Sequence, residues 1–196
     1  GTAVALPAVG YANNSRSHFE EQDVWETGIV GNTIHSDGWL NRHLATSEGH
    51  GVVRAVSVGD SLPRILRGDA TALSVRGLSD IAFSERPDRM AGVVAALEAA
   101  YASKQEGAAQ ELLASSGKET LEALEELQAL ASQEFRPKAE WPDTDLGRRM
   151  REAARLIQGD VGLEVVELDL GGWDTHQNQG GIGGPYSQLC LLYTSP

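Results

Sequence analysis

The chain has 196 residues, of which 41% are apolar, and is long enough to bury the core of one sizeable domain. Its formal net charge of −12 argues against a nucleic-acid partner, because binding to a phosphate backbone requires a basic face. The sequence contains no run of about 18 apolar residues, so no membrane-spanning helix is predicted. The single cysteine, Cys190, excludes an internal disulfide framework and a four-cysteine zinc site.

The first part of the chain predicts a strand followed by two short helices. Residues 3–9 form a short apolar run that is typical of a buried strand. Ser17 opens a Ser-x-x-Glu capping pattern, which predicts a helix that ends at about Thr27. A second short helix is expected to begin near Asp37, and its Trp39 is expected to lie in the core.

The rest of the chain predicts strands on either side of a helical block. Residues 52–58 are rich in β-branched side chains and predict a second strand, and a shorter one is expected near 72–75. Apolar residues then recur at helical spacing through 85–160, where Gly159 is suited to ending the last helix. Residues 163–170 predict a strand that runs into a pair of glycines.

Strands at both ends with helices between them predict the α/β fold class, a sheet that carries a mostly helical insertion. The strands at 3–9, 52–58 and 163–170 are expected to lie in one sheet. The expected parts of the chain are a first part of the α/β core at 1–84, a helical insertion or cap at 85–160, a core strand with a metal-motif loop at 161–188, and a tail at 189–196.

The strongest local signal is the sequence Gly-Gly-Trp-Asp-Thr-His at 171–176, directly after the last predicted strand. Ligands of open α/β sheets gather beyond the carboxyl ends of strands. Asp174 and His176 are two residues apart, so in an extended segment they offer a carboxylate and an imidazole to a divalent metal on one side. The alternative is a surface turn. Residues 161–196 hold four acidic side chains and no lysine or arginine, which fits a solvated surface or a cation site.

A second signal is Ser-Arg-Ser-His at positions 15–18, between the first predicted strand and the first predicted helix. The free N–H groups of a helix start bind anions. Ser15 or Ser17 is therefore a candidate nucleophile, and Arg16 is a candidate partner for phosphate or sulfate oxygens. The alternative is that Ser17 only caps the helix.

Together these motifs resemble one known family. The matching blocks, in chain order, are Gly10-Tyr11, Ser-Arg-Ser-His-Phe at 15–19, Asp-Val-Trp-Glu-Thr-Gly at 23–28, Asp-Gly-Trp-Leu-Asn-Arg at 37–42 and the segment 171–176. Over roughly residues 1–185 the sequence is similar to the bacterial family catalogued as domain of unknown function 1501, which looks like a branch of the alkaline phosphatase and sulfatase superfamily. The resemblance implies an α/β/α sandwich with a two-metal hydrolytic site at the strand ends.

The resemblance also implies roles for individual residues. Asp174 and His176 would be ligands of divalent metal ions, which could be Zn, Ca, Mg or Mn. Ser15 or Ser17 would lie where the superfamily places its nucleophile, and Arg16 and His18 would line the site. The implied substrate is a small-molecule phosphate or sulfate ester, and the implied location is periplasmic or secreted.

The chain departs from the family pattern at both ends. It begins after the Tat-type export signal and an early Gly-Gly-x-Asp segment, and it lacks the later Ser-Glu-Phe-Gly-Arg and Thr-Asp-His-Gly blocks. We therefore expect an internal fragment that is inactive by itself, since Asp174 and His176 alone are too few ligands for an ion. Residues 189–196 look like translated sequencing adapter, and the alternative is a genuine exposed apolar tail.

The parent protein is expected to be an exported metal-dependent hydrolase of phosphate or sulfate esters. One alternative is a non-catalytic exported binding or assembly protein that keeps the fold, and another is a mutase or transferase of the same superfamily. The hydrolase interpretation requires Asp174 to lie within about 15 Å of the loop at 15–18, the reach of a shared site for one small ester.

Overall fold

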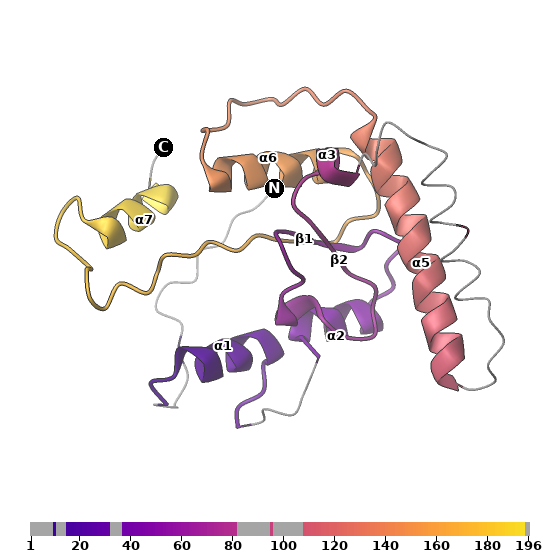
Figure 1. Ribbon diagram of the computed structural model, residues 1–196, viewed down its shortest axis with the longest axis horizontal. Helices are drawn as coiled ribbons and strands as arrows, with labels where there is room; N and C mark the ends of the chain where they lie inside the picture. The colour runs from indigo at the N-terminus through magenta and orange to yellow at the C-terminus, as the bar shows by residue number, and fades with distance from the viewer. Residues whose placement is uncertain (1–9, 11–14, 32–36, 82–94, 96–107, 195–196) are drawn as a thin grey trace.

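A three-stranded parallel sheet lies at the centre of the computed structural model, which describes residues 10, 15–31, 37–81, 95 and 108–194 (Figure 1). Its order is β2-β1-β3, with bounds β1 Ala55–Val58, β2 Leu73–Val75 and β3 Val165–Glu167. The fold is therefore mixed α/β with parallel strands, as the sequence predicts. The strand expected at 3–9 lies outside the described residues.

The central strand β1 is buried along its whole length. In the ladder Ser57 lies opposite Ser74 of β2 and opposite Glu167 of β3. The two strands predicted at 52–58 and 163–170 do share one sheet, but both are shorter than expected. The strands are shorter because a strand ends where its backbone no longer forms ladder hydrogen bonds with a neighbouring strand.

One face of the sheet is covered by three helices: α3 Leu78–Ile81, α5 Ala108–Ala131 and α6 Asp145–Gln158. Val56 and Val58 of β1 pack there against Leu127 of α5 and Leu156 of α6, and all four side chains are buried. This is the larger of the two apolar clusters, and the long α5 runs along the edge of the molecule in Figure 1.

The opposite face is covered by α2 Trp39–Thr46 and the short 3₁₀ helix η1 Arg64–Leu66, where Leu44 and Leu66 pack on Ala55. The prediction that Trp39 lies in the core is wrong, because 45% of its surface is exposed. The face that α2 buries carries Asn41 and Leu44, which are three residues apart, and Trp39 lies outside that stripe.

Local signals set the helix ends where the sequence predicts them. The first helix, α1, spans His18–Thr27; the hydroxyl of Ser17 accepts a hydrogen bond from the backbone N–H of Glu20, and Gly28 ends the helix in the left-handed conformation. Gly159 ends α6 in a right-handed conformation, and its N–H donates to the carbonyls of Arg155 and Leu156 in the last turn. The capping role predicted for Ser17 is thus confirmed.

The expected helical block is interrupted within its described part. Residues 132–144 are not helical and contain two prolines, which separate α5 from α6. Much of the expected block, at 82–94 and 96–107, lies outside the described residues. Within the described ranges no helix has both the length and the apolar character to cross a bilayer.

The last helix, α7, spans Pro185–Thr194 and includes most of the segment 189–196 that the sequence marks as a possible adapter tail. Figure 1 shows α7 apart from the sheet and its covering helices, at the end of an extended segment that leaves β3. The side chain of Leu189 lies over Gly172, and the ring of Trp173 meets Tyr186 edge-on at 6.1 Å. We call this unit, residues 171–194, the C-terminal arm.

Candidate metal centre and adjoining cavity

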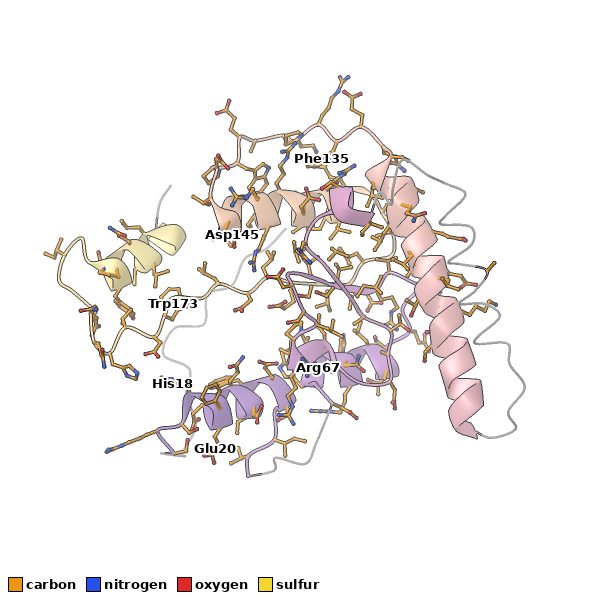
Figure 2. All side chains as sticks on the ribbon, in the orientation of Figure 1. His18, Glu20, Arg67, Phe135, Asp145 and Trp173 are labelled. Atoms are coloured by element: carbon orange, nitrogen blue, oxygen red, sulfur yellow. The ribbon has the colours of Figure 1, made fainter. Side chains whose placement is uncertain are left out.

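Two segments that are far apart in the sequence meet at the start of α1. His18 is the first residue of α1, and Asp174 and His176 lie on the C-terminal arm just after β3 (Figure 2 labels His18 and Trp173). Their imidazole and carboxylate groups come into direct contact across 158 positions of the chain. Asp174 therefore lies well within the expected distance of the segment 15–18.

The three side chains form a compact cluster. Nε2 of His18 is 3.4 Å from Nε2 of His176 and 3.9 Å from Oδ1 of Asp174. The separation between His176 Nε2 and Asp174 Oδ1 is 2.8 Å. All three side chains are between 61% and 66% exposed, so the cluster is open to solvent.

The three side chains offer two imidazoles and one carboxylate to a single ion. The separation of the two imidazole nitrogens matches that of ligands on a tetrahedral ion, whereas the 2.8 Å contact is that of a hydrogen bond or ion pair and the 3.9 Å contact is longer. Atoms bound about 2.0–2.2 Å from a tetrahedral ion lie about 3.4 Å from one another. One potential ligand atom from each of the three residues lies within 4.8 Å of the other two. Three protein ligands leave a coordination position open, which is the pattern of catalytic rather than structural zinc.

The two candidate serines differ in their contacts. Ser15 donates a hydrogen bond from its hydroxyl to Oε1 of Glu21 at 2.5 Å and accepts one from the backbone N–H of Ser17 at 3.2 Å. Ser17 is occupied as the cap of α1. Only Ser15 therefore has a carboxylate in position to take its proton, which is what an activated serine requires.

Arg16, the candidate anion partner, is exposed and adopts a left-handed backbone conformation with φ of 55°. That conformation is uncommon for a residue other than glycine, asparagine or aspartate. Arg16 makes no hydrogen bond or ion pair with the described residues. Its guanidinium is therefore not fixed to any of the described residues, although Arg16 lies two positions before His18 in the chain.

A large cavity of about 1080 Å³ opens beyond the carboxyl ends of β1 and β3. Ser57 and Glu167 lie at this end of the sheet, and the buried Ser57 hydroxyl donates to Oε2 of Glu167 at 2.7 Å. The chain leaves β3 through Asp169, whose backbone carbonyl accepts a hydrogen bond from Arg149 of α6. The same end of the sheet thus carries both the cavity and the route to the C-terminal arm.

The motif at 37–42 supports one wall of this cavity. Asn41 is 1% exposed and donates through Nδ2 to the carbonyls of Leu66 and Ala70, at 2.8 and 2.7 Å. Arg42 donates to the carbonyls of Thr27 and Asp37, which ties the end of α1 to the start of α2. Asn41 and Arg42 therefore hold the backbone around the cavity, and their side chains bond to backbone carbonyls rather than to the residues of the cluster.

At the opposite end of the sheet, Arg54 and Glu164 join the entries to β1 and β3. Arg54 donates to both carboxylate oxygens of Glu164, at 2.5 and 3.2 Å. The hydrogen bond from Arg54, followed by its charge, holds the pKa of Glu164 below its usual value. The same contact with Glu164 raises the pKa of Arg54.

Sequence reasoning groups Asp174 with His176 and places His18 only as a residue that lines the site. It does not identify His18 as a possible third ligand, although a site with two ligands needs another and His18 is the histidine of the segment expected nearby. It also does not identify the cavity residues Ser57 and Asp60. Their only signal is their place at the carboxyl end of a predicted strand.

Comparison with known proteins gives one match. A family model described as "Protein of unknown function (DUF1501)" matches residues 7–185, a range that includes the cluster and every residue lining the cavity. No curated protein and no solved structure matches the chain.

Proposed function

This chain belongs to the family described as protein of unknown function DUF1501, and from that premise we propose that it forms part of a metal-dependent hydrolase of phosphate or sulfate esters. The proposal includes an evolutionary relation to the alkaline phosphatase and sulfatase superfamily. The observation that carries it is the cluster of His18, Asp174 and His176, in which the start of α1 meets the segment that follows β3.

The donor set favours a zinc-type ion. Two imidazole nitrogens and one carboxylate oxygen suit zinc or another first-row transition ion better than calcium or magnesium, which prefer oxygen ligands throughout. Such an ion would polarise the phosphoryl or sulfuryl oxygen and offset the charge that develops on it. His18, Asp174 and His176 hold their positions without other partners among the described side chains, so they are available as ligands.

The residues at 15–18 supply the remaining groups. In this proposal Ser15 attacks the phosphorus or sulfur atom while its proton passes to Glu21, which accepts its hydrogen bond. The bond to the ester oxygen breaks, and the alcohol leaves with the proton returned by Glu21. A water molecule then hydrolyses the phosphorylated or sulfated Ser15, which releases phosphate or sulfate and restores the serine hydroxyl. Arg16 binds the non-bridging oxygens of the ester through its guanidinium fork. Ser17 takes no chemical part, because its hydroxyl holds the first turn of α1.

Zinc binding by the intact chain tests the metal centre directly. We expect isothermal titration calorimetry to show one Zn²⁺ site, and His18→Ala, Asp174→Ala and His176→Ala each to weaken it at least about tenfold, since each removes one of three ligands. His50→Ala is the matched control, because His50 is exposed and lies outside the cluster. Unchanged affinity in the three variants would disprove the assignment.

Turnover of aryl phosphate and aryl sulfate, by the chain or by any longer protein that contains it, tests the reaction. We expect hydrolysis that Asp174→Ala abolishes and that Ser15→Ala lowers far more than Ser17→Ala. Zinc binding without any such turnover would instead favour the non-catalytic binding or assembly role. Equal losses in the two serine variants would remove Ser15 as the nucleophile.

A further inference from the structure

We propose that the cavity at the strand ends binds the alcohol half of the ester, and that this alcohol is a polyhydroxylated group without negative charge, such as a neutral sugar. The inference rests on the proposed function, because it names the substrate class for the neighbouring cluster.

The cavity lies where a parallel sheet binds ligands. β1 connects to β2 on one side, whereas β3 lies on the other side of β1, so the strand order reverses between β1 and β3. Ligands of open α/β sheets bind outside the carboxyl ends of the strands at this kind of reversal. Ser57 and Glu167, one from each of these two strands, line the cavity.

The chain connects the cavity to the three-residue cluster at two places, although no cluster residue lines the cavity. On α1, Phe19, Gln22, Asp23 and Glu26 line the cavity, a spacing that places them on one face of the helix. His18 begins that same helix. At the second place, the chain runs from Asp169 in the cavity to Asp174 in the cluster, five residues later. The inference therefore requires a ligand that extends from the cavity along this segment, with its ester group at the cluster.

The charges that line the cavity have both signs. Three guanidinium groups face seven carboxylates, which are those of Asp23, Glu26, Asp37, Asp60, Asp69, Glu167 and Asp169. A hydroxyl group both donates and accepts hydrogen bonds, so it can pair with either kind of side chain. An alcohol that carries its own negative charge is repelled by the excess of carboxylates.

Two of these carboxylates are free to bind a ligand. The side chains of Asp69 and Asp169 are exposed and make no hydrogen bond or ion pair with the residues that the structure describes. Asp23, by contrast, is paired with Arg64, and Glu26 accepts the backbone N–H of Ile65. The unpaired carboxylates are therefore the expected acceptors for sugar hydroxyls.

Phe19 adds an aromatic surface. Its side chain is 83% exposed, although it lines the cavity. A large apolar ring in that position gains free energy when a ligand covers it, and the C–H face of a sugar ring is apolar while its edge is hydroxylated. An aromatic ring beside free carboxylates thus matches the two kinds of surface that a neutral sugar presents.

Saturation-transfer NMR with glucose and glucuronate tests this inference, because the two sugars share one ring and differ by a carboxylate. The experiment uses the intact chain with a chelator, so neither metal nor hydrolysis is needed. We expect glucose at millimolar concentration to receive saturation, and glucuronate to bind about tenfold more weakly, which corresponds to about 1.4 kcal/mol of repulsion.

Variants then locate the site. Phe19→Ala is expected to weaken glucose binding at least about fivefold, and the double change Asp69→Asn with Asp169→Asn is expected to remove most of the preference for glucose over glucuronate. Asp143→Asn is the control, since Asp143 is an exposed carboxylate outside the cavity. All three altered positions are exposed, so the variants should fold.

Equal binding of glucose and glucuronate, no saturation of glucose, or variants that behave like the control would each overturn the inference. These results are separable from the zinc titration. If zinc binds and glucose does not, only the substrate class is wrong. If glucose binds with the expected preference and zinc does not, the ligand class is supported and the proposed hydrolase activity fails.

Discussion

At the scale of single residues, the pair of Arg54 and Glu164 links stability to pH. The folded pKa of Glu164 is lowered by Arg54, so the pair stabilises the fold at any pH above the unfolded value of about 4.3. This contribution is lost as the pH falls through the folded pKa. The carboxyl group is 29% exposed, so screening by water keeps the contribution near about 1 kcal/mol.

Glu164→Gln is therefore expected to lower the free energy of unfolding at pH 7 by about 1 kcal/mol. The difference from the original chain should shrink at a second pH below about 4.3, because the stabilisation is lost progressively as the carboxyl group takes up its proton. Urea denaturation at the two pH values measures it. Glu134→Gln is the control, since its pair with Arg136 is far more exposed and its loss should change little at either pH. A constant difference at both pH values would contradict the assignment.

At the scale of elements, α2 determines the shape of the cavity wall that follows β1. Oδ1 of Asn41 accepts a hydrogen bond from the backbone N–H of Ala70 at 3.0 Å, and Nδ2 of the same side chain donates to two backbone carbonyls. Gly38 lies so close to η1 that an added Cβ would be 2.0 Å from the carbonyl oxygen of Ile65. The connection from η1 to β2 is therefore held by a side chain on one side and by close backbone packing on the other.

Asn41→Ala should destabilise the chain by about 2–3 kcal/mol, because it leaves buried backbone groups without partners. It should also weaken glucose binding, since the wall that carries Asp69 loses its support. Denaturation in urea and the NMR titration measure the two effects. Asn178→Ala, at an exposed position of the C-terminal arm, should change neither. A loss below about 0.5 kcal/mol would show that the wall is held by other contacts.

Helix ends were predictable at this scale because their signals are local. Ser17 and Gly159 act within one turn of their own backbone, so their sequence context is sufficient. The position of Trp39 was not, because its exposure depends on which face of α2 turns toward η1. The lengths of β1 and β3 likewise depend on where their neighbours run.

At the scale of the whole molecule, the sequence indicates the α/β class and the proximity of two distant segments, but not their detailed contact. The spacing of Asp174 and His176 is a local property. The approach of His18 to within 3.4 Å of His176 depends on how α1 packs against the sheet. The cavity depends on residues from several elements. Some of them, such as Phe19 and Asp23, belong to the conspicuous sequence blocks, whereas Ser57, Asp60 and Glu167 belong to none.

An ion held by His18, Asp174 and His176 would also act as a cross-link between the body and the C-terminal arm. At a concentration of Zn²⁺ one hundred times the dissociation constant, binding stabilises the folded state by about 2.7 kcal/mol. We expect zinc to raise the melting temperature by about 5–10 °C and to slow proteolysis of the arm loop at 177–184. His176→Ala should abolish both effects, and a zinc effect that persists in this variant would contradict the cross-link.

The burial of β1 on both faces has a consequence for cooperativity. Val56 and Val58 belong to the cluster with α5 and α6, whereas Ala55 belongs to the cluster with α2 and η1. Neither apolar layer can open without exposing the strand that it shares with the other. The apolar layers on the two faces of the sheet should therefore unfold in one transition. The amide protons of β1 should be among the slowest to exchange with solvent.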